Sequence, residues 1–159
     1  MEKFNLFKTN AYYNNRYGWT LKNNPNQTWL SDDSDLEMNL INQNDTTFKK
    51  WLDKYKYHDR YPEKPKQYYR EQCNYILSQY EEKLNANMYL LRNNISIADI
   101  AIFPFIRQFS NVDYDWFSTN CHHLKNWLET IIASDLFLSV MNKYEIWGNK
   151  HQSKIISWE

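Results

Sequence analysis

The feature that most constrains this sequence is a short polar signal at the head of a long apolar segment. Ser96 stands three residues before Asp99, and residues 97–109 are almost all apolar. A serine three positions ahead of an acidic residue is typical of a capping box, in which the two side chains satisfy backbone N–H groups at the start of a helix. Ile95 and Ile100 are spaced for the hydrophobic staple that accompanies it. The pattern predicts a central, buried helix.

Apolar residues recur at steps of three and four along much of the remaining chain. They predict an amphipathic helix at residues 34–55, bent near residues 42–47, where Asn, Asp and Thr side chains compete for backbone hydrogen bonds. A loop with two prolines follows at residues 57–65, and a second amphipathic helix is predicted at residues 67–85. The mixture of aromatic residues and asparagines at residues 9–24 is one that a helix can accommodate.

Two more helices are expected after the apolar segment. Asn120 is placed to cap the first, which covers residues 120–132, and Ser134 is placed to cap the second. The side chains of that last helix predicted to face the core are Leu136, Phe137, Val140, Met141 and Tyr144. Pro104 lacks a backbone donor and should kink the central helix. The segments together predict an all-α bundle of about five to six helices with no strand.

Composition narrows the classes of function. Only two of the 159 residues are glycine, which argues against tight hairpins and glycine-rich phosphate loops, because both need positive φ or close backbone approach. Basic and acidic side chains number 19 each, so neither a basic excess nor a basic block points to nucleic acid or an anionic membrane. The mean hydropathy is −0.85, and no signal peptide or membrane-spanning run is found. Cys73 and Cys121 fit no Cys-x-x-Cys spacing, and we expect a reduced, cytoplasmic protein.

The segment at residues 96–109 resembles the motif that opens the core helix of the glutathione S-transferase C-terminal domain. In that family a Ser/Thr-x-x-Asp capping box starts this helix, and Leu-Leu-Gly-Asp commonly precedes it. Here the preceding residues 90–94 are Leu-Leu-Arg-Asn-Asn. Residues 48–63 and 127–144 are also similar to helices of the family, so the resemblance covers roughly residues 36–147. It implies the all-α fold of that domain, with Ser96 and Asp99 as its structural capping box.

The same resemblance implies that the glutathione-binding half of the family is almost entirely missing. A complete transferase begins with a thioredoxin-like half that activates the glutathione thiol, and only residues 17–25 are similar to the final helix of that half. We therefore expect residues 1–30 to form an N-terminal arm, residues 31–147 the helical domain and residues 148–159 a polar tail. No cofactor is expected, and glutathione would bind only if a thioredoxin-like half were supplied.

Residues with metal-binding or nucleophilic chemistry also have simple structural explanations. Cys121, His122 and His123 suggest a metal site, but successive side chains on a helix diverge by about 100°, so we expect no metal there. Cys73 lies on the apolar face of its predicted helix, which favours a buried, inert thiol over a reactive one. No catalytic residue is predicted.

Four residues are candidates for a ligand cleft. They are Asp45, Lys49, Tyr55 and Arg107. Arg107 lies in the apolar central helix, where it either pairs with a carboxylate such as Asp99 or Asp113 or contacts an anion in a cleft. The other three lie on the long helix at residues 34–55, either on a solvated face or, as the resemblance implies, on a wall of the cleft.

Two classes of function follow from the resemblance. The first is a non-catalytic interaction or dimerisation module, or a truncated remnant, that forms a homodimer or binds a protein partner. Candidates for its exposed aromatic surface are Trp19, Trp29 and Trp116. The second is a transferase that conjugates glutathione to small electrophiles once a thioredoxin-like half is supplied in trans. No membrane or nucleic-acid partner is expected. Aromatic clusters at residues 12–13, 68–69 and 113–117 could stack on bases, but basic residues do not interleave with them, so a core or interface role is preferred.

Overall fold

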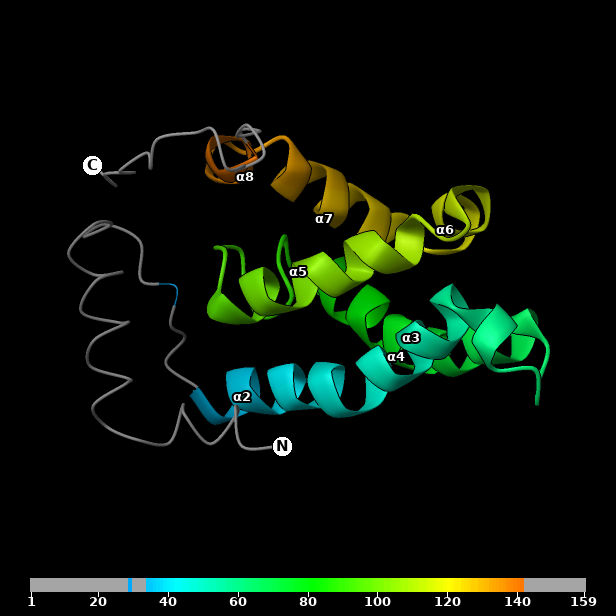
Figure 1. The fold of residues 1–159 in the computed structure, drawn as a ribbon. Helices are drawn as coiled ribbons and strands as arrows, with labels where there is room; N and C mark the ends of the chain where they lie inside the picture. Colours follow the sequence, from blue (N-terminus) through cyan, green and yellow to red (C-terminus); the bar gives the residue numbers. More distant parts are fainter. Residues whose placement is uncertain (1–28, 30–33, 142–159) are drawn as a thin grey trace, which may run out of the picture.

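The computed structural model describes Trp29 and residues 34–141, and this part of the chain is an all-α bundle without a strand (Figure 1). Its first helix is continuous but irregular: α2 (Ser34–Gln43) passes through a π-helical turn (Asn44–Phe48) into α3 (Lys49–Lys56). The turn falls where the sequence predicts a bend. The hydroxyl of Thr46 donates to the carbonyl of Asn42 at 2.6 Å, the local competition expected of such residues.

The remaining helices follow in an order close to the predicted one. After a 3₁₀ turn at His58–Arg60 come α4 (Lys66–Ala86), α5 (Ile97–Ser110), α6 (Tyr114–Asn120), α7 (His122–Ile132) and α8 (Asp135–Val140). Counting α2, the π turn and α3 as one bent helix gives six helices in the described residues. The helix suggested at residues 9–24 lies outside them.

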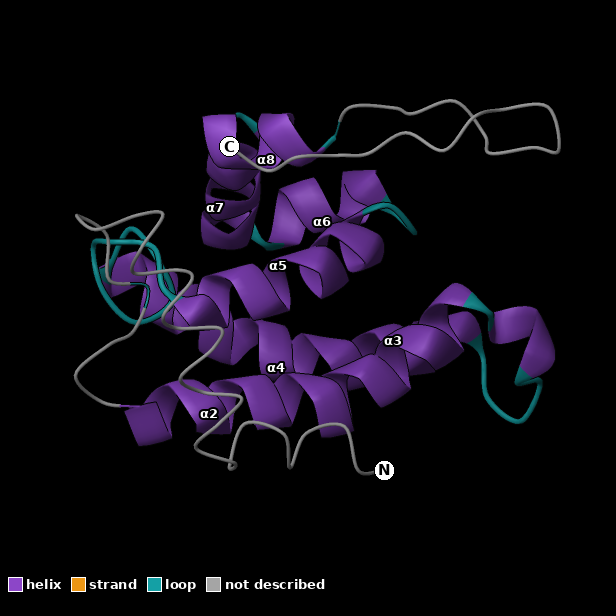
Figure 2. Ribbon diagram, turned by 60° about the vertical axis from the view of Figure 1, so that its left-hand side comes forward, coloured by secondary structure: helices purple, strands orange, loops and turns teal. Residues whose placement is uncertain are grey.

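The central helix of the bundle is α5, as the apolar segment predicts. It contacts α2, α3, α6 and α7, and α4 packs against α3 and α7. Figure 2 shows α5 between the bent α2–α3 helix and α7. The ring of Phe109 lies 5.2 Å from that of Tyr55 and 6.2 Å from that of Phe117, measured between centroids, so aromatic packing joins three helices. Pro104 lies inside α5, and its side chain is exposed.

The short helix α6 was not predicted, and it changes the start of α7. Asp113 caps α6 by accepting a hydrogen bond from the backbone N–H of Trp116 at 3.1 Å. Because α6 extends through Asn120, that side chain donates to the carbonyl of Trp116 instead of capping α7. The prediction that Asn120 caps α7 is therefore wrong. The N-cap position belongs to Cys121, whose side chain makes no capping hydrogen bond.

The helix α8 is more exposed than its pattern predicts. Ser134 caps it, as predicted, by accepting from the N–H of Phe137 at 3.3 Å. Phe137 is half-buried against Phe103, but Leu136 is 41% exposed and Met141 45% exposed, so their predicted burial is wrong. α8 has only six residues and rests on α7, so a single side of it is covered.

Candidate functional site

The carboxylate of Asp99 forms the polar centre of the bundle. It is fully buried, and one oxygen accepts from the backbone N–H and the hydroxyl of Ser96 at 2.8 and 2.5 Å. The other oxygen accepts from the N–H of Leu90 and from Nε1 of Trp127, both at 2.9 Å. The capping box predicted at Ser96 and Asp99 is thus present, and it also ties the loop before α5 and the middle of α7 to the start of α5. No local sequence signal points to Leu90 or Trp127.

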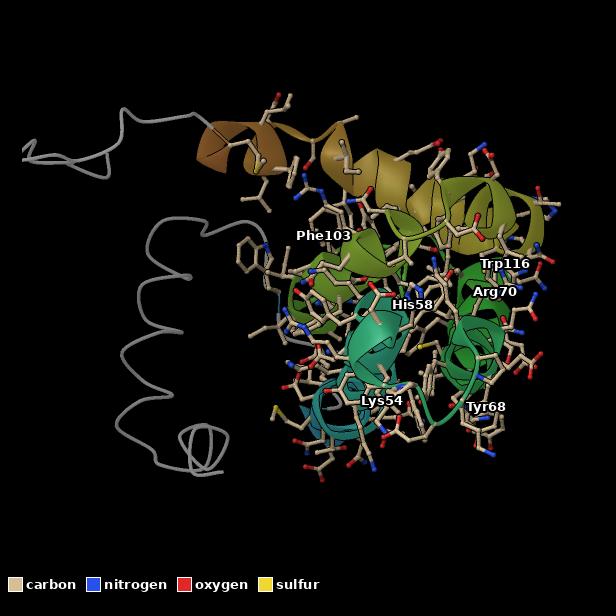
Figure 3. The ribbon with its side chains drawn as sticks, turned by 45° about the vertical axis from the view of Figure 1, so that its right-hand side comes forward. Lys54, His58, Tyr68, Arg70, Phe103 and Trp116 are labelled. Carbon is tan, nitrogen blue, oxygen red and sulfur yellow. The ribbon has the colours of Figure 1, made fainter. Side chains whose placement is uncertain are left out.

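A groove of about 620 Å³ opens between α5, α7 and α8. Its lining residues are Trp29, Ile100, Phe103, Pro104, Arg107, Gln108, Asn111, Ile131, Leu136 and Phe137. The walls are mostly apolar, and the rings of Phe103 and Phe137 meet edge to face with centroids 5.3 Å apart. Figure 3 shows Phe103 on the side of the molecule where α8 lies. A concave, largely apolar surface of this volume is the usual form of a binding site.

Arg107 and Trp29, two of the lining residues, carry side chains that only donate hydrogen bonds. The guanidinium of Arg107 lies over the ring of Phe137, 5.3 Å from its centroid. The indole Nε1 of Trp29 is buried and has no hydrogen-bond partner among the described residues, while the carbonyl of Trp29 accepts from the N–H of Ile97 at 2.7 Å. Trp29 therefore lines the groove, but it is half-buried, so the expectation that it belongs to an exposed aromatic surface is wrong.

The predicted carboxylate partners of Arg107 are occupied elsewhere. Asp99 is engaged in the capping box, and Asp113 pairs with Arg70 at 3.2 Å. In the described part of the chain, no carboxylate lies within ion-pair distance of Arg107, so the predicted pairing with Asp99 or Asp113 is wrong. The alternative, that Arg107 faces a cleft, agrees with its place in the groove.

The other three cleft candidates do not join Arg107. Tyr55 is 1% exposed and packs on Phe109 in the core, and burial, with a further contribution from the charge of Asp113, raises the pKa of its hydroxyl. Asp45 lies half-buried in the π-helical turn, where burial raises its pKa more than the Asn44 amide and the Lys49 charge lower it. The side chain of Lys49 pairs with Asp53 on the exposed side of α3 at 2.5 Å.

Both cysteines are free, buried thiols. Burial raises the pKa of Cys73 to about 12, and burial together with the nearby charge of Glu81 raises the pKa of Cys121 to about 12. Neither thiol is ionised at neutral pH, so neither is a nucleophile in this fold. His122 and His123 are exposed whereas Cys121 is buried. Among Trp29 and residues 34–141, no three His, Cys, Asp or Glu side chains are grouped to hold a metal ion.

Trp116 lies away from the groove. Its ring meets Phe109 edge to face at 6.1 Å, and the guanidinium of Arg70 lies 4.6 Å from its centroid. It is half-buried, so the expectation that it belongs to an exposed aromatic surface is wrong. Trp19 is outside the described residues.

Comparison with known proteins finds a family model that matches the sequence of this chain. Residues 43–135, more than half of the chain, match the family model described as glutathione S-transferase, C-terminal domain. The matched segment includes α5, α7 and most of the groove wall. No curated protein and no solved structure matches the chain. None of the helices within residues 34–141 is long and apolar enough to cross a membrane.

Proposed function

This chain belongs to the glutathione S-transferase C-terminal domain family, and from that premise we propose that it is a non-catalytic interaction module that forms a homodimer. The observation that carries the proposal is the groove together with three exposed apolar side chains of α8 and its C-cap, of which Leu136 lines the groove. Leu136, Leu138 and Met141 are 41%, 54% and 45% exposed. We call the groove and these three side chains the groove face. Exposed apolar surface gathered around a concavity is typical of an interaction site.

The occupant that best fits the groove face is a second copy of this chain. A two-fold interface uses one patch twice, so it needs both a hollow and a projection on the same surface. The groove supplies the hollow, and the leucines of α8 supply the projection. Arg107 lies in the groove and Asp135 begins α8, so pairing the two faces does not bring a single sign of charge against itself.

The buried thiols support a role without catalysis. Cys73 and Cys121 stay protonated at neutral pH, and no cofactor is part of the proposal. A glutathione site would come only from a thioredoxin-like half supplied by another chain. Two unlinked, buried cysteines are typical of proteins kept in a reducing compartment, which supports a cytoplasmic location.

The test of dimerisation is sedimentation velocity across a range of concentrations. The full chain should pass from monomer to dimer as its concentration rises. Leu136→Asp places a charge in the groove face and should weaken dimerisation by about tenfold or more. Ser139→Asp adds the same charge at an exposed position of the same helix outside the groove lining, and it should dimerise like the parent. A parent chain that stays monomeric throughout contradicts the proposal.

A second candidate function is a glutathione transferase that acts with a thioredoxin-like half supplied in trans. The groove volume of about 620 Å³ favours it, because pockets for small molecules span roughly 300–1,000 Å³. Calorimetric titration of the chain with glutathione, alone and with a separately expressed thioredoxin-like domain, distinguishes the two. The interaction module gives no binding heat alone and, with the added domain, no more heat than that domain gives by itself. Heat beyond that of the added domain, together with conjugation of a small electrophile, favours the enzyme.

A further inference from the structure

The net charge of the whole chain is zero, but one region of it is strongly basic. Residues 49–70 contain eight basic and three acidic side chains, a net charge of +5 with His58 neutral. In contrast, residues 34–48 and 71–141 have net charges of −3 and −4. The basic residues belong to α3, the 3₁₀ turn and the first turns of α4, which lie together at one end of the bundle (Figure 1). The expectation that no basic block exists therefore needs correction.

The acidic side chains of this region are already engaged. They are Asp53 with Lys49, Asp59 with His58, and Glu63 with the hydroxyl of Tyr69. Arg70 pairs with Asp113. Six cations remain that no carboxylate in the described part of the chain approaches within ion-pair distance: Lys50, Lys54, Lys56, Arg60, Lys64 and Lys66. The positive charge is therefore not neutralised internally.

Each of these six cations lies over an aromatic ring. The distances from the charged group to the ring centroid range from 4.9 Å for Arg60 over Tyr57 to 5.7 Å for Lys54 over Trp51. Lys54 also lies over Tyr61 at 5.1 Å and over Tyr69 at 5.6 Å. We call the six cations and their rings the basic–aromatic end. Basic residues do interleave with aromatic ones here, contrary to the sequence-based expectation.

Cation–π contacts hold the basic side chains in place before any partner arrives. Each contact contributes about 0.5–1 kcal/mol at an exposed site. A flexible lysine that is already ordered loses less rotamer freedom on binding, which favours association. A carboxylate of the chain itself is already bound in this region, because Glu63 accepts a hydrogen bond from the hydroxyl of Tyr69 at 3.3 Å. In Figure 3, Lys54 and Tyr68 lie on the lower side of the molecule, away from Phe103 of the groove.

We propose that the basic–aromatic end binds an acidic segment of a partner protein. A second copy is a poor occupant, because a two-fold axis at this end would bring a charge of +5 against itself. Single-stranded nucleic acid is also a poor occupant, because it binds by stacking bases on free ring faces, and these rings carry the protein's own cations. Five of the six cations are lysines, which pair with carboxylates but lack the forked geometry that arginine offers to phosphate.

This inference goes beyond the proposed dimer, because it concerns a surface that shares no residue with the groove face. Its test uses a fluorescent oligoglutamate peptide as the probe and anisotropy as the measurement, at a physiological ionic strength of about 0.15 M. The full chain should bind the peptide, and binding should weaken as salt rises. Lys50→Glu combined with Lys64→Glu should weaken binding by about tenfold.

A matched double variant controls for net charge. Lys83→Glu combined with Lys125→Glu makes the same change in α4 and α7, outside the basic–aromatic end, and should alter binding by less than about twofold. Leu136→Asp should bind the peptide like the parent, so failure of the dimer and failure of this inference are seen separately. Circular dichroism checks that each variant is folded, and the neutral pair Lys50→Gln and Lys64→Gln gives a milder version of the same loss.

Three results would overturn the inference. The first is no binding of oligoglutamate by the full chain. The second is an equal loss in both double variants, which would show that only net charge matters. The third is tighter binding of an oligothymidylate of equal length, with the same dependence on Lys50 and Lys64, which would assign the surface to nucleic acid.

Discussion

The helices α5 and α7 are capped at their N-termini in different ways. The first backbone N–H groups of each helix have no partner inside the helix. At α5 the acceptors are local, because the side chains of Ser96 and Asp99 accept from each other's N–H groups across three residues. At α7 the acceptor comes from another helix: the carboxylate of Glu81 in α4 accepts from the N–H groups of His123 and Leu124 at 3.1 and 2.7 Å.

The difference explains why one start was predicted and the other was not. A capping box is visible in four consecutive residues, so the start of α5 follows from the sequence. Glu81 is separated from His123 by 42 residues, and only the packing of α4 on α7 brings its carboxylate to the helix end. A negative charge is also favourable there, because it opposes the positive end of the helix dipole.

The largest effect is expected when the local cap is removed. Asp99→Ala deprives two buried backbone N–H groups and the indole of Trp127 of their acceptor, so it should lower the free energy of unfolding by about 4 kcal/mol. Chemical denaturation measures the change. Asp115→Ala removes an exposed aspartate from the first turn of α6 and should cost under about 1 kcal/mol. Similar losses in both variants would mean that Asp99 is not the centre of the bundle.

Removing the cap supplied by α4 should have a smaller and more local effect. Glu81→Ala should lower the free energy of unfolding by about 1–2 kcal/mol, the usual cost of a lost helix cap. Hydrogen exchange should speed up at the amides of His123 and Leu124 while the start of α5 keeps its protection. Glu82→Ala, at the exposed neighbouring position, is the control. Unchanged exchange at the start of α7 would refute the role of Glu81.

The smallest effect concerns the reactivity of Cys121 at the N-cap of α7. A helix N-terminus normally lowers the pKa of a cysteine, but burial and the charge of Glu81 raise the pKa of Cys121 to about 12. An alkylating reagent at pH 8 should therefore modify neither thiol until the protein unfolds. Glu81→Ala should lower the pKa of Cys121 and speed its alkylation, with Cys73 as the internal control because its pKa is raised by burial alone.

The same thiols predict a dependence of stability on pH. In the folded state each pKa is raised from its ordinary value of 9.0 to about 12, so the unfolded chain releases these protons first as pH rises. Their contribution to stability is complete below pH 9.0 and is lost progressively between pH 9.0 and about 12. The midpoint of thermal unfolding should fall across this window. Alkylation of Cys121 in the folded chain at pH 8 as fast as in the unfolded chain would contradict both expectations.

The sequence predicts helices better than it predicts which residues share a site. Periodicity locates α4 and α5, and polar competition locates the irregular turn between α2 and α3, because these signals act within a few residues. Helix packing places the candidate cleft residues in different environments, because Tyr55 lies in the core whereas Arg107 lines the groove. Helix α6 was missed because an aromatic stretch was assigned to core or interface, although the cap at Asp113 was there to find.

The sequence alone determined the all-α class, the start of α5 and the family resemblance, since capping and apolar periodicity are interactions between near neighbours. It also contained the eight basic side chains of residues 49–70, six of which form the basic–aromatic end, although the zero net charge of the whole chain does not reveal them. Only the tertiary structure decided that Glu81 caps α7, that Asp99 holds Trp127, and that α5, α7 and α8 enclose a groove. These contacts join residues tens of positions apart, and their geometry is set by how the helices pack rather than by any local pattern.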